Sequence, residues 1–267
     1  MSHPYQSRYD FDLHKYVHPT KHMGKITDYF DIKENSADHE VKMLMSMMKH
    51  RIPFSLSRFN DGEMGGIQRV GASIARGDQI VDNSLHNKLI ECIKHEQTNY
   101  FVGMPCKTCF SHMRDTADSL VRSDYPYKIR ACCITNRNWL YFIQNFKDSL
   151  DGRKLNWVGG DDQKFDVFDD WGIELDFKAH VPRQNSWSVY EDILPMVNKF
   201  KDGDVIGLSC GPLSRILAKE WFEANPTLTV IDIGSGTDPF TRPKWEDCHI
   251  GWPETGHCIT ARCPECN

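Results

Sequence analysis

The sequence predicts an α/β protein whose helices cover both faces of a mainly parallel sheet. Short segments with strand character alternate with longer segments of helical periodicity along most of the chain. This alternation favours helical crossovers between neighbouring strands, and therefore parallel pairing. No linker-like or low-complexity segment divides the alternating region, and 267 residues suffice for one large domain of this kind.

The first helix and strand show the pattern clearly. Val41, Leu44 and Met48 recur at helical spacing behind Ser36, a possible N-cap, and Pro53 ends the helix. Residues 54–57 then alternate as a strand does. The same reasoning predicts helices at 85–93, 111–122, 139–146, 189–197 and 213–221. The strands that follow these helices are predicted at 100–104, 129–135, 155–158, 204–209 and 229–233.

Three parts are expected along the chain. Residues 1–35 are polar and lack sustained periodicity, which is typical of an N-terminal arm. Residues 36–240 contain all the predicted helices and strands and are expected to form one domain. Residues 241–267 are rich in Pro, Gly, Trp, His and Cys, and we expect an irregular Cys/His-rich C-terminal extension there.

Composition and charge exclude several classes of protein. Hydrophobic residues make up 40% and charged residues 26%, which is typical of a soluble globular chain. With a net charge of −5, the chain lacks the excess of basic residues that is typical of a dedicated nucleic-acid binder. No apolar run is long enough to span a bilayer, and the polar N-terminus lacks the apolar core of a secretory signal. We therefore expect a cytoplasmic protein with no membrane span and no nucleic-acid partner.

The segment after the first strand combines a cation with two carboxylates. In open α/β sheets, ligands bind beyond the carboxyl ends of the strands, and Arg58, Asp61, Gly62 and Glu63 follow such an end. Carboxylates on both sides of a glycine can face one Mn²⁺ or Mg²⁺, which prefer oxygen ligands. The arginine fork suits phosphate. A surface turn is the alternative, because Asn-Asp-Gly is also common turn chemistry.

Another strand ends at Ser209 and is followed by Gly211 and Pro212 at the start of a helix. Proline is favoured in the first helical turn, where free N–H groups can bind an anion such as a diphosphate. An ordinary strand-to-helix turn uses the same residues, so both interpretations stay open at this point.

These segments resemble the GT-D-type glycosyltransferases. Ser-Arg-Phe-Asn-Asp-Gly-Glu at 57–63 is similar to the family's Arg-Phe-Gly-Asp-Gly-Glu signature, whose DxE motif binds a divalent metal and the nucleotide sugar. The strand, Gly-Pro turn and helix at 204–218 and the strand ending at Gly234 are also similar. The resemblance implies a Rossmann-like catalytic domain at 36–240 with Mn²⁺ or Mg²⁺ on Asp61 and Glu63. It further implies a nucleotide-diphosphate sugar donor, with a UDP-sugar favoured, and a glycan or other hydroxyl acceptor.

The sequence departs from the family pattern in two places. Asn60 stands where the family usually has Gly. The family commonly has a His in a His-Ile-Asp pattern after the last strand, whereas this chain has Ser235, Gly236, Thr237 and Asp238. Asp238 can match the family's Asp, but this chain has no His at the corresponding position to perform the role of the family's His.

Sugar transfer to a hydroxyl needs a base, and a carboxylate is the usual choice. The candidates are Asp162, Asp232 and Asp238, each placed near or after the end of a predicted strand, with Asp161 as a neighbouring alternative. Asn185 lies in a Pro-Asn-aromatic segment that resembles relatives of the family, and Asn136 follows another strand. The expected donor-binding residues are Arg58, Gly62, Asn136, Asn185, Ser209, Gly211 and Pro212.

The glycines at 234 and 236 suggest a second enzyme class. Residues 231–237 are similar to the glycine-rich first motif of S-adenosylmethionine-dependent methyltransferases. That motif closes the first strand and opens a helix. Here it follows the last predicted strand, and with Pro239 and Pro243 close behind we expect no helix after it. A methyltransferase is therefore the alternative rather than the favoured enzyme.

The chain contains ten cysteines, an unusual number without a secretory signal. Four fall in predicted helices or strands and are expected to be buried: Cys92, Cys132, Cys133 and Cys210. The pairs Cys106-x-x-Cys109 and Cys263-x-x-Cys266 have the spacing of structural zinc ligands. The two pairs could meet, or the second could join Cys248 and Cys258 in a local site. A zinc-stabilised interaction domain without enzymatic activity is thus a third alternative.

Overall fold

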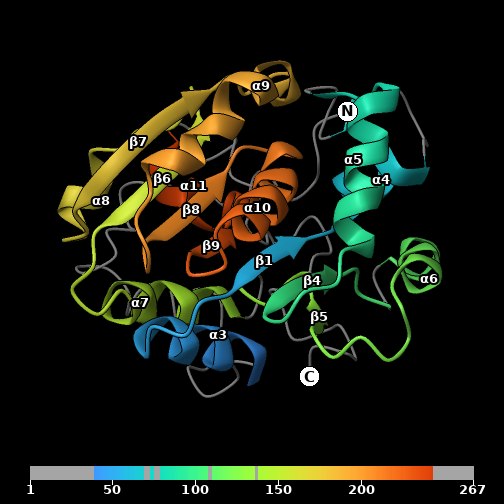
Figure 1. The fold of residues 1–267 in the computed structure, drawn as a ribbon. Coiled ribbons are helices and arrows are strands. Elements are labelled where there is room, and N and C mark those ends of the chain that lie inside the picture. Colours follow the sequence, from blue (N-terminus) through green and yellow to red (C-terminus); the bar gives the residue numbers. More distant parts are fainter. Residues whose placement is uncertain (1–38, 69–72, 75–78, 108–109, 136–137, 243–267) are drawn as a thin grey trace, which may run out of the picture.

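The computed structural model describes residues 39–68, 73–74, 79–107, 110–135 and 138–242. They surround one central sheet, which runs diagonally across Figure 1. The predicted N-terminal arm at 1–35 and almost all of the predicted extension at 241–267 lie outside these residues, so the proposed division into three parts stays a prediction.

The strands and helices have the following bounds. The strands are β1 (Ser55–Arg58), β2 (Ser73–Ile74), β3 (Gln79–Ile80), β4 (Tyr100–Met104), β5 (Lys128–Arg130), β6 (Leu155–Gly160), β7 (Leu175–Val181), β8 (Val205–Ser209) and β9 (Thr229–Asp232). The α-helices are α3 (His39–Lys49), α4 (Asp61–Gln68), α5 (Asn83–Lys94), α6 (Ser111–Leu120), α7 (Trp139–Ser149), α8 (Val167–Asp170), α9 (Tyr190–Ile193), α10 (Leu213–Ala224) and α11 (Asp238–Thr241). The 3₁₀ helices are η4 (Ser186–Val189), η5 (Leu194–Lys199) and η6 (Gly234–Thr237).

Seven strands form the central sheet in the order β5-β4-β1-β9-β8-β6-β7, and neighbouring strands pair in parallel. Strands β2 and β3 form a separate antiparallel pair. From β1 the chain first adds β4 and β5 on one side and then crosses to β6 on the other. The last strand, β9, fills the position between β1 and β8. The order of strands reverses beside β1, which is where ligands bind in open α/β sheets.

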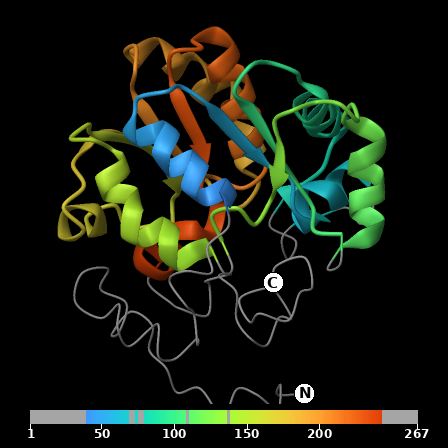
Figure 2. The same cartoon turned by 90° about the horizontal axis from the view of Figure 1, so that it is seen from below.

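Two hydrophobic cores lie between the sheet and the helices, one on each face of the sheet. One core contains the apolar faces of α3, α7 and α8, with Leu56 and Ile231 from the sheet. The other contains those of α4, α5, α6, α9 and α10, with Val230 and Leu208. Consecutive residues such as Val230 and Ile231 enter opposite cores because side chains alternate along a strand. Figure 2 shows α3 and α7 side by side across one face of the sheet.

The predicted α/β class with helices on both faces of a parallel sheet is confirmed. Its details differ in four places. The strand expected at 129–135 is limited to β5, because the chain turns at 131–134. The edge strand β7 and the helix α4 were not predicted. The expectation of no helix after Gly236 was wrong, since the one-turn helix α11 begins at Asp238 with a proline in its first turn.

None of the helices among the described residues has the length and apolarity that a bilayer crossing requires.

Candidate functional site

Three segments predicted to carry function end at the same edge of the sheet. Strands β1, β8 and β9 are neighbours, and their carboxyl ends lie at Arg58, Ser209 and Asp232. The register pairs Leu208 with Asp232, so the segments that follow β8 and β9 start side by side. The parallel sheet therefore brings together motifs that are up to about 170 residues apart in the sequence.

Arg58 is bound entirely within the protein. Its backbone N–H donates to Asp232 Oδ2 at 3.0 Å, and its Nε donates to the Asp232 carbonyl at 2.7 Å. Its Nη1 and Nη2 donate to the carbonyls of Ala131 and Ile233 at 3.1 and 2.6 Å. Only 4% of the residue is exposed. This arginine joins the ends of β1 and β9 to the turn after β5, and its expected contact with the donor stays a prediction.

Arg215, in the first turn of α10, is the centre of this edge. Its Nε lies 2.7 Å from the carbonyl oxygen of Arg58 and 3.0 Å from Asp232 Oδ2. Its Nη1 donates to the Gly211 carbonyl at 2.6 Å, and its Nη2 lies 3.1 Å from Glu63 Oε1. Burial disfavours its charge, but the carboxylates of Asp232 and Glu63 outweigh burial and raise its pKa. Arg215 thus links β1, β9, α4 and the start of α10.

The predicted metal-binding pair is placed on α4. Asp61 is the first residue of this helix and is exposed, whereas Glu63 is buried in the same turn. Glu63 Oε2 accepts a hydrogen bond from the Asn60 backbone N–H at 3.1 Å, and its Oε1 pairs with Arg215. Burial is the main cause that raises the pKa of Glu63, with the Arg215 charge acting in the opposite direction.

This donor set does not fit a shared divalent cation. Both oxygens of Glu63 already have a hydrogen-bonding or charged partner, and Asp61 lies on the outside of the same turn. Within the part of the chain that the structure describes, no three His, Cys, Asp or Glu side chains are grouped as metal ligands. Dependence on Mn²⁺ or Mg²⁺ therefore stays a prediction.

A second polar cluster lies beyond β6 and β8. Gln163 Nε2 donates to Ser209 Oγ at 2.8 Å and to Asp238 Oδ1 at 3.2 Å. Ser209 Oγ in turn donates to the Gly234 carbonyl at 2.7 Å. Arg242 Nε lies 3.0 Å from Asp238 Oδ1. These contacts tie the ends of β6, β8 and β9 together. Neither Gln163 nor Arg242 was predicted from the sequence to belong to a site.

The three candidate bases differ in how far they reach solvent. Asp232 is fully buried, and its Oδ1 has no hydrogen-bond partner among the described residues. Asp238 is 1% exposed and binds Gln163 and Arg242. Asp162 keeps 21% of its side chain exposed and pairs with Arg183 at 3.1 Å and with Arg242. Of these three carboxylates, only Asp162 has appreciable access to a ligand from solution.

A loop after β7 borders the start of α10. Gln79, on β3, holds this loop: its Nε2 donates to the Arg183 carbonyl at 2.7 Å, and its Oε1 accepts from the Ser186 N–H at 2.9 Å. Asn185 has a left-handed backbone with φ of 52°, a conformation that costs energy for a residue other than glycine. A Cβ added at Gly211 would lie 3.5 Å from Ser186 Oγ and 3.6 Å from Gln79 Nε2. The predicted residues Asn185 and Gly211 are therefore near one another.

The remaining predicted site residues lie outside the described residues or have the following positions. Asn136, Cys109, Cys263 and Cys266 lie outside the described residues, so the proposed zinc site stays a prediction. Cys106 is buried. Pro212 is the N-cap of α10, and Gly62 follows Asp61 in α4. Four cysteines are buried as predicted: Cys92, Cys132, Cys133 and Cys210.

The glycine-rich segment after β9 does not open a long helix. It forms the 3₁₀ helix η6 and the single turn α11. Gly234 has φ of 53°, and a Cβ there would come within 2.5 Å of Arg58 Nη2. This glycine is needed for close packing against Arg58, in a place that differs from the strand-to-helix turn of a methyltransferase cofactor motif.

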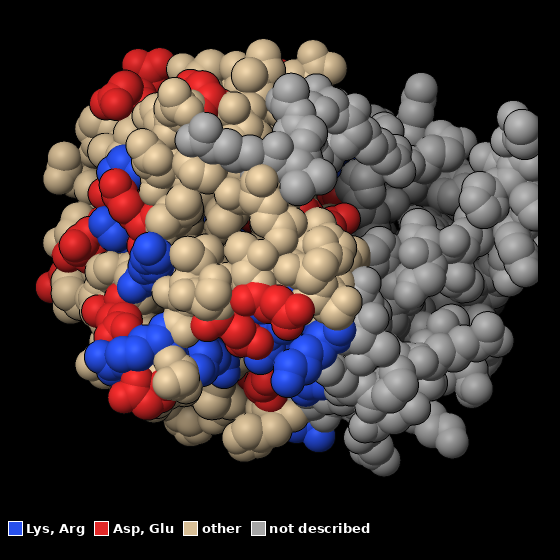
Figure 3. All heavy atoms as spheres, turned by 90° about the vertical axis from the view of Figure 1, so that its right-hand side faces the viewer, with Lys and Arg blue, Asp and Glu red and all other residues tan. Residues whose placement is uncertain are grey.

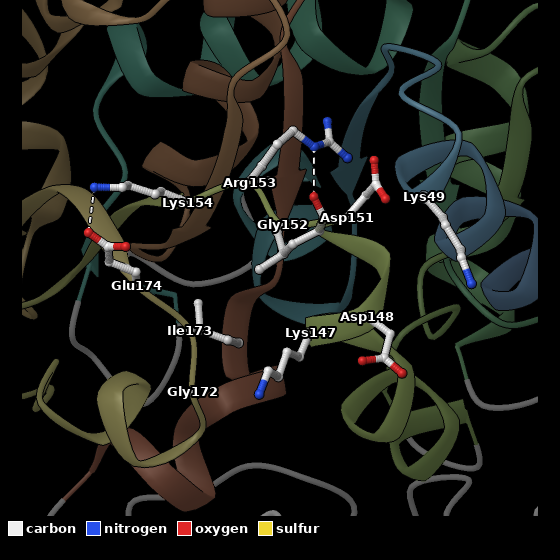
Figure 4. A pocket seen from close by; sticks show the side chains of 11 residues that line it. Lys49, Lys147, Asp148, Asp151, Gly152, Arg153, Lys154, Gly172, Ile173 and Glu174 are labelled. Atoms are coloured by element: carbon white, nitrogen blue, oxygen red, sulfur yellow. Dashed lines mark hydrogen bonds and ion pairs between the residues drawn. The ribbon is translucent and has the colours of Figure 1, made fainter.

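A hollow of about 520 Å³ lies at the opposite edge of the sheet. Figure 4 shows its lining, which includes Lys147, Arg153, Lys154 and Glu174. Arg153 and Lys154 directly precede β6, Glu174 directly precedes β7, and Lys147 is in the last turn of α7. The hollow is therefore at the amino ends of the strands. Arg153 donates to the carbonyls of Leu150 and Gly203, and Lys154 pairs with Glu174. The hollow is thus remote from the site described above.

The face formed by α5 and α6 carries charges of both signs. Figure 3 shows lysines and arginines interleaved with acidic side chains there. Ion pairs such as Arg114–Asp118, Lys88–Glu91 and Arg122–Glu96 account for this mixture. The charge on this face is locally balanced at the surface, in contrast to the buried charges around Arg215.

Comparison with known proteins identifies the fold. No protein-family model matches the sequence, and no curated protein matches it. Among solved structures, a glycosyltransferase with domain DUF1792 from Streptococcus sanguinis is similar, with a TM-score of 0.61 and 18% identity over 82% of this chain and 91% of that one. A selenomethionine-substituted DUF1792 structure gives 0.59 and 16% identity, covering 82% and 88%. A third DUF1792 structure, described as having a distinct glycosyltransferase fold, gives 0.55 and 18% identity, covering 73% and 76%.

These similarities agree with the resemblance found in the sequence motifs, and they concern the fold. The likeness extends over most of this chain and most of each of the other three. This chain has the α/β glycosyltransferase fold of the solved DUF1792 structures.

Proposed function

We propose that this protein is a glycosyltransferase that moves a sugar from a nucleotide-diphosphate sugar to a hydroxyl acceptor. The observation that carries the proposal is the convergence of three motif segments at the carboxyl ends of β1, β8 and β9, in a fold shared with DUF1792 glycosyltransferases. The carboxyl end of β1, beside which the strand order reverses, is the expected position for a nucleotide in such a sheet.

The donor is anionic, and this edge offers groups that can bind an anion. Arg183 and Arg242 both pair with Asp162 next to the carboxyl end of β6. Gly211 has a left-handed backbone in the turn before α10, where the missing side chain lets a ligand approach the backbone closely. We propose that these groups bind the diphosphate and stabilise the negative charge that develops on it as the sugar leaves. Asn185, on the loop held by Gln79, is proposed to contact the nucleotide or sugar.

We propose Asp162 as the base that accepts the proton of the attacking hydroxyl. A base must come within hydrogen-bonding reach of the acceptor, and Asp162 has a partly exposed side chain whereas Asp232 and Asp238 are buried. In the described state both arginines pair with its carboxylate. Binding of the diphosphate would draw these arginines towards the donor and leave the carboxylate available to the acceptor.

The test is a screen of UDP- and GDP-sugars in which release of the nucleoside diphosphate is measured with and without acceptor sugars. Asp162→Asn should lower kcat by about 10²–10⁴-fold while the fold is retained, because a positioned base contributes that much. Asp166→Asn is the matched control, since Asp166 is an exposed carboxylate near the same strand end. Equal losses in the two variants would refute the assignment of Asp162. The absence of turnover with every donor, together with tight binding of S-adenosylmethionine, would refute the transferase itself.

A further inference from the structure

The carboxylate of Glu63 completes the start of α4. Asn60 occupies the N-cap position, and its carbonyl accepts the first helical hydrogen bond from the Met64 N–H at 2.9 Å. Glu63 is the third residue of the helix, and its Oε2 accepts from the Asn60 N–H at 3.1 Å. This reach of the third residue back to the N-cap N–H is one half of a capping box. Oε2 of Glu63 therefore has a structural partner within its own turn.

The other carboxylate oxygen of Glu63, Oε1, connects α4 to α10. Oε1 lies 3.1 Å from Arg215 Nη2, and the two side chains are 8% and 7% exposed. Arg215 also contacts Asp232, the Arg58 carbonyl and the Gly211 carbonyl. The pair consequently fixes the first turn of α4 against the ends of β1 and β9 and against the first turn of α10.

Asp61 is placed differently from Glu63. Two residues apart in a helix correspond to about 200° around the axis, so the two side chains leave α4 in nearly opposite directions. Asp61 is exposed and Glu63 is buried, as this geometry requires. A single cation cannot take the place of Arg215 on Glu63 without leaving a buried guanidinium short of a partner.

We infer that Glu63 is a positioning residue rather than a metal ligand: it caps α4 and holds Arg215, and thereby fixes the turn that presents Asp61 at the carboxyl edge. The Asn60 that departs from the family signature contributes its backbone N–H and carbonyl to the same cap. This inference does not depend on the proposed sugar transfer.

Thermal unfolding in EDTA distinguishes the two roles by the sign of the effect. Glu63→Ala leaves the Arg215 Nη2 and the Asn60 N–H without their acceptors, so we expect Tm to fall by at least about 5 °C. Asp61→Ala is the matched control and should lower Tm by less than about 2 °C. If both residues were metal ligands, removing either one without metal would relieve repulsion between them. Tm would then stay unchanged or rise in both variants, which would overturn the inference.

Glu63→Gln keeps one acceptor oxygen and tests whether the contacts themselves matter. We expect its Tm between those of the wild type and Glu63→Ala, because one of the two donors regains its partner. A double-mutant cycle of Glu63→Gln and Arg215→Lys measures the interaction energy between the two side chains. It provides the test if Glu63→Ala does not fold. Additive effects in that cycle would overturn the inference.

A titration with Mn²⁺, followed by electron paramagnetic resonance of the free ion, measures metal affinity. This quantity is separate from the stability of the fold. Glu63→Gln should change Mn²⁺ affinity by less than about threefold. A tenfold or greater loss of affinity together with an unchanged Tm in EDTA would identify Glu63 as a ligand and overturn the inference.

Discussion

Substitution of Gly234 by alanine tests the buried connection between β1 and β9. The residue has φ of 53°, so any side chain there costs about 1–2 kcal/mol. An alanine Cβ would also lie 2.5 Å from Arg58 Nη2, which donates to the Ile233 carbonyl at 2.6 Å. Moving that guanidinium breaks a charged hydrogen bond worth about 1.5–3 kcal/mol. We therefore expect a total loss of about 2.5–5 kcal/mol in the free energy of unfolding.

Gly203→Ala is the matched control. Gly203 also has a positive φ, of 82°, but no heavy atom lies within 4 Å of the added Cβ, so only the backbone cost of about 1–2 kcal/mol applies. Urea unfolding followed by far-UV circular dichroism measures both variants, provided that their m-values match. A difference of less than about 0.5 kcal/mol between them would refute the claim that Arg58 is fixed against Gly234.

Three further predictions follow from the contacts described above. Arg215→Met should lower the free energy of unfolding by about 3–5 kcal/mol, because it leaves buried carboxylates without their cation; a loss below about 1 kcal/mol in urea unfolding would contradict this. Gln79→Ala should speed amide exchange in the loop around Ser186, measured by hydrogen–deuterium exchange, whereas an unchanged rate would contradict the role of Gln79. Burial raises the pKa of Cys133 and Cys210 to about 12, so both thiols are protonated at pH 8. They should react with iodoacetamide slowly until the protein is unfolded, and rapid labelling of the native protein would refute their burial.

The main course of the chain could be predicted because buried strands and amphipathic helices leave local patterns. The strand at Tyr100–Met104 was predicted with the bounds that the structure has. The edge strand β7 was missed although its residues alternate strictly, with Leu175, Phe177 and Ala179 apolar and polar residues between them. The signal of an amphipathic edge strand was present in the sequence and was not recognised.

Helix α4 was missed for a different reason. Its glycines at 62, 65 and 66 have low helix propensity and hide the periodicity. The cue that remained was Asn60 followed three residues later by Glu63, the spacing of a capping box. Treating the same residues as an exposed metal-binding turn assigned Asp61 and Glu63 one environment, whereas the helix gives them opposite ones.

The role of Arg215 could not be predicted from local sequence. It lies within an amphipathic helix, where an arginine usually faces solvent. Its partner Arg58 is 157 residues away, and Asp232 and Glu63 come from two other segments. Only the order of strands, which places β9 between β1 and β8, brings these groups together.

The most direct test of the proposed function is the crystal structure of the protein with a UDP- or GDP-sugar. The proposal predicts that the diphosphate lies at the carboxyl ends of β1, β8 and β9, in contact with the Gly211 turn and with Arg183 or Arg242. Binding at the amino-end hollow beside Arg153, or no nucleotide density at saturating concentration, would contradict it.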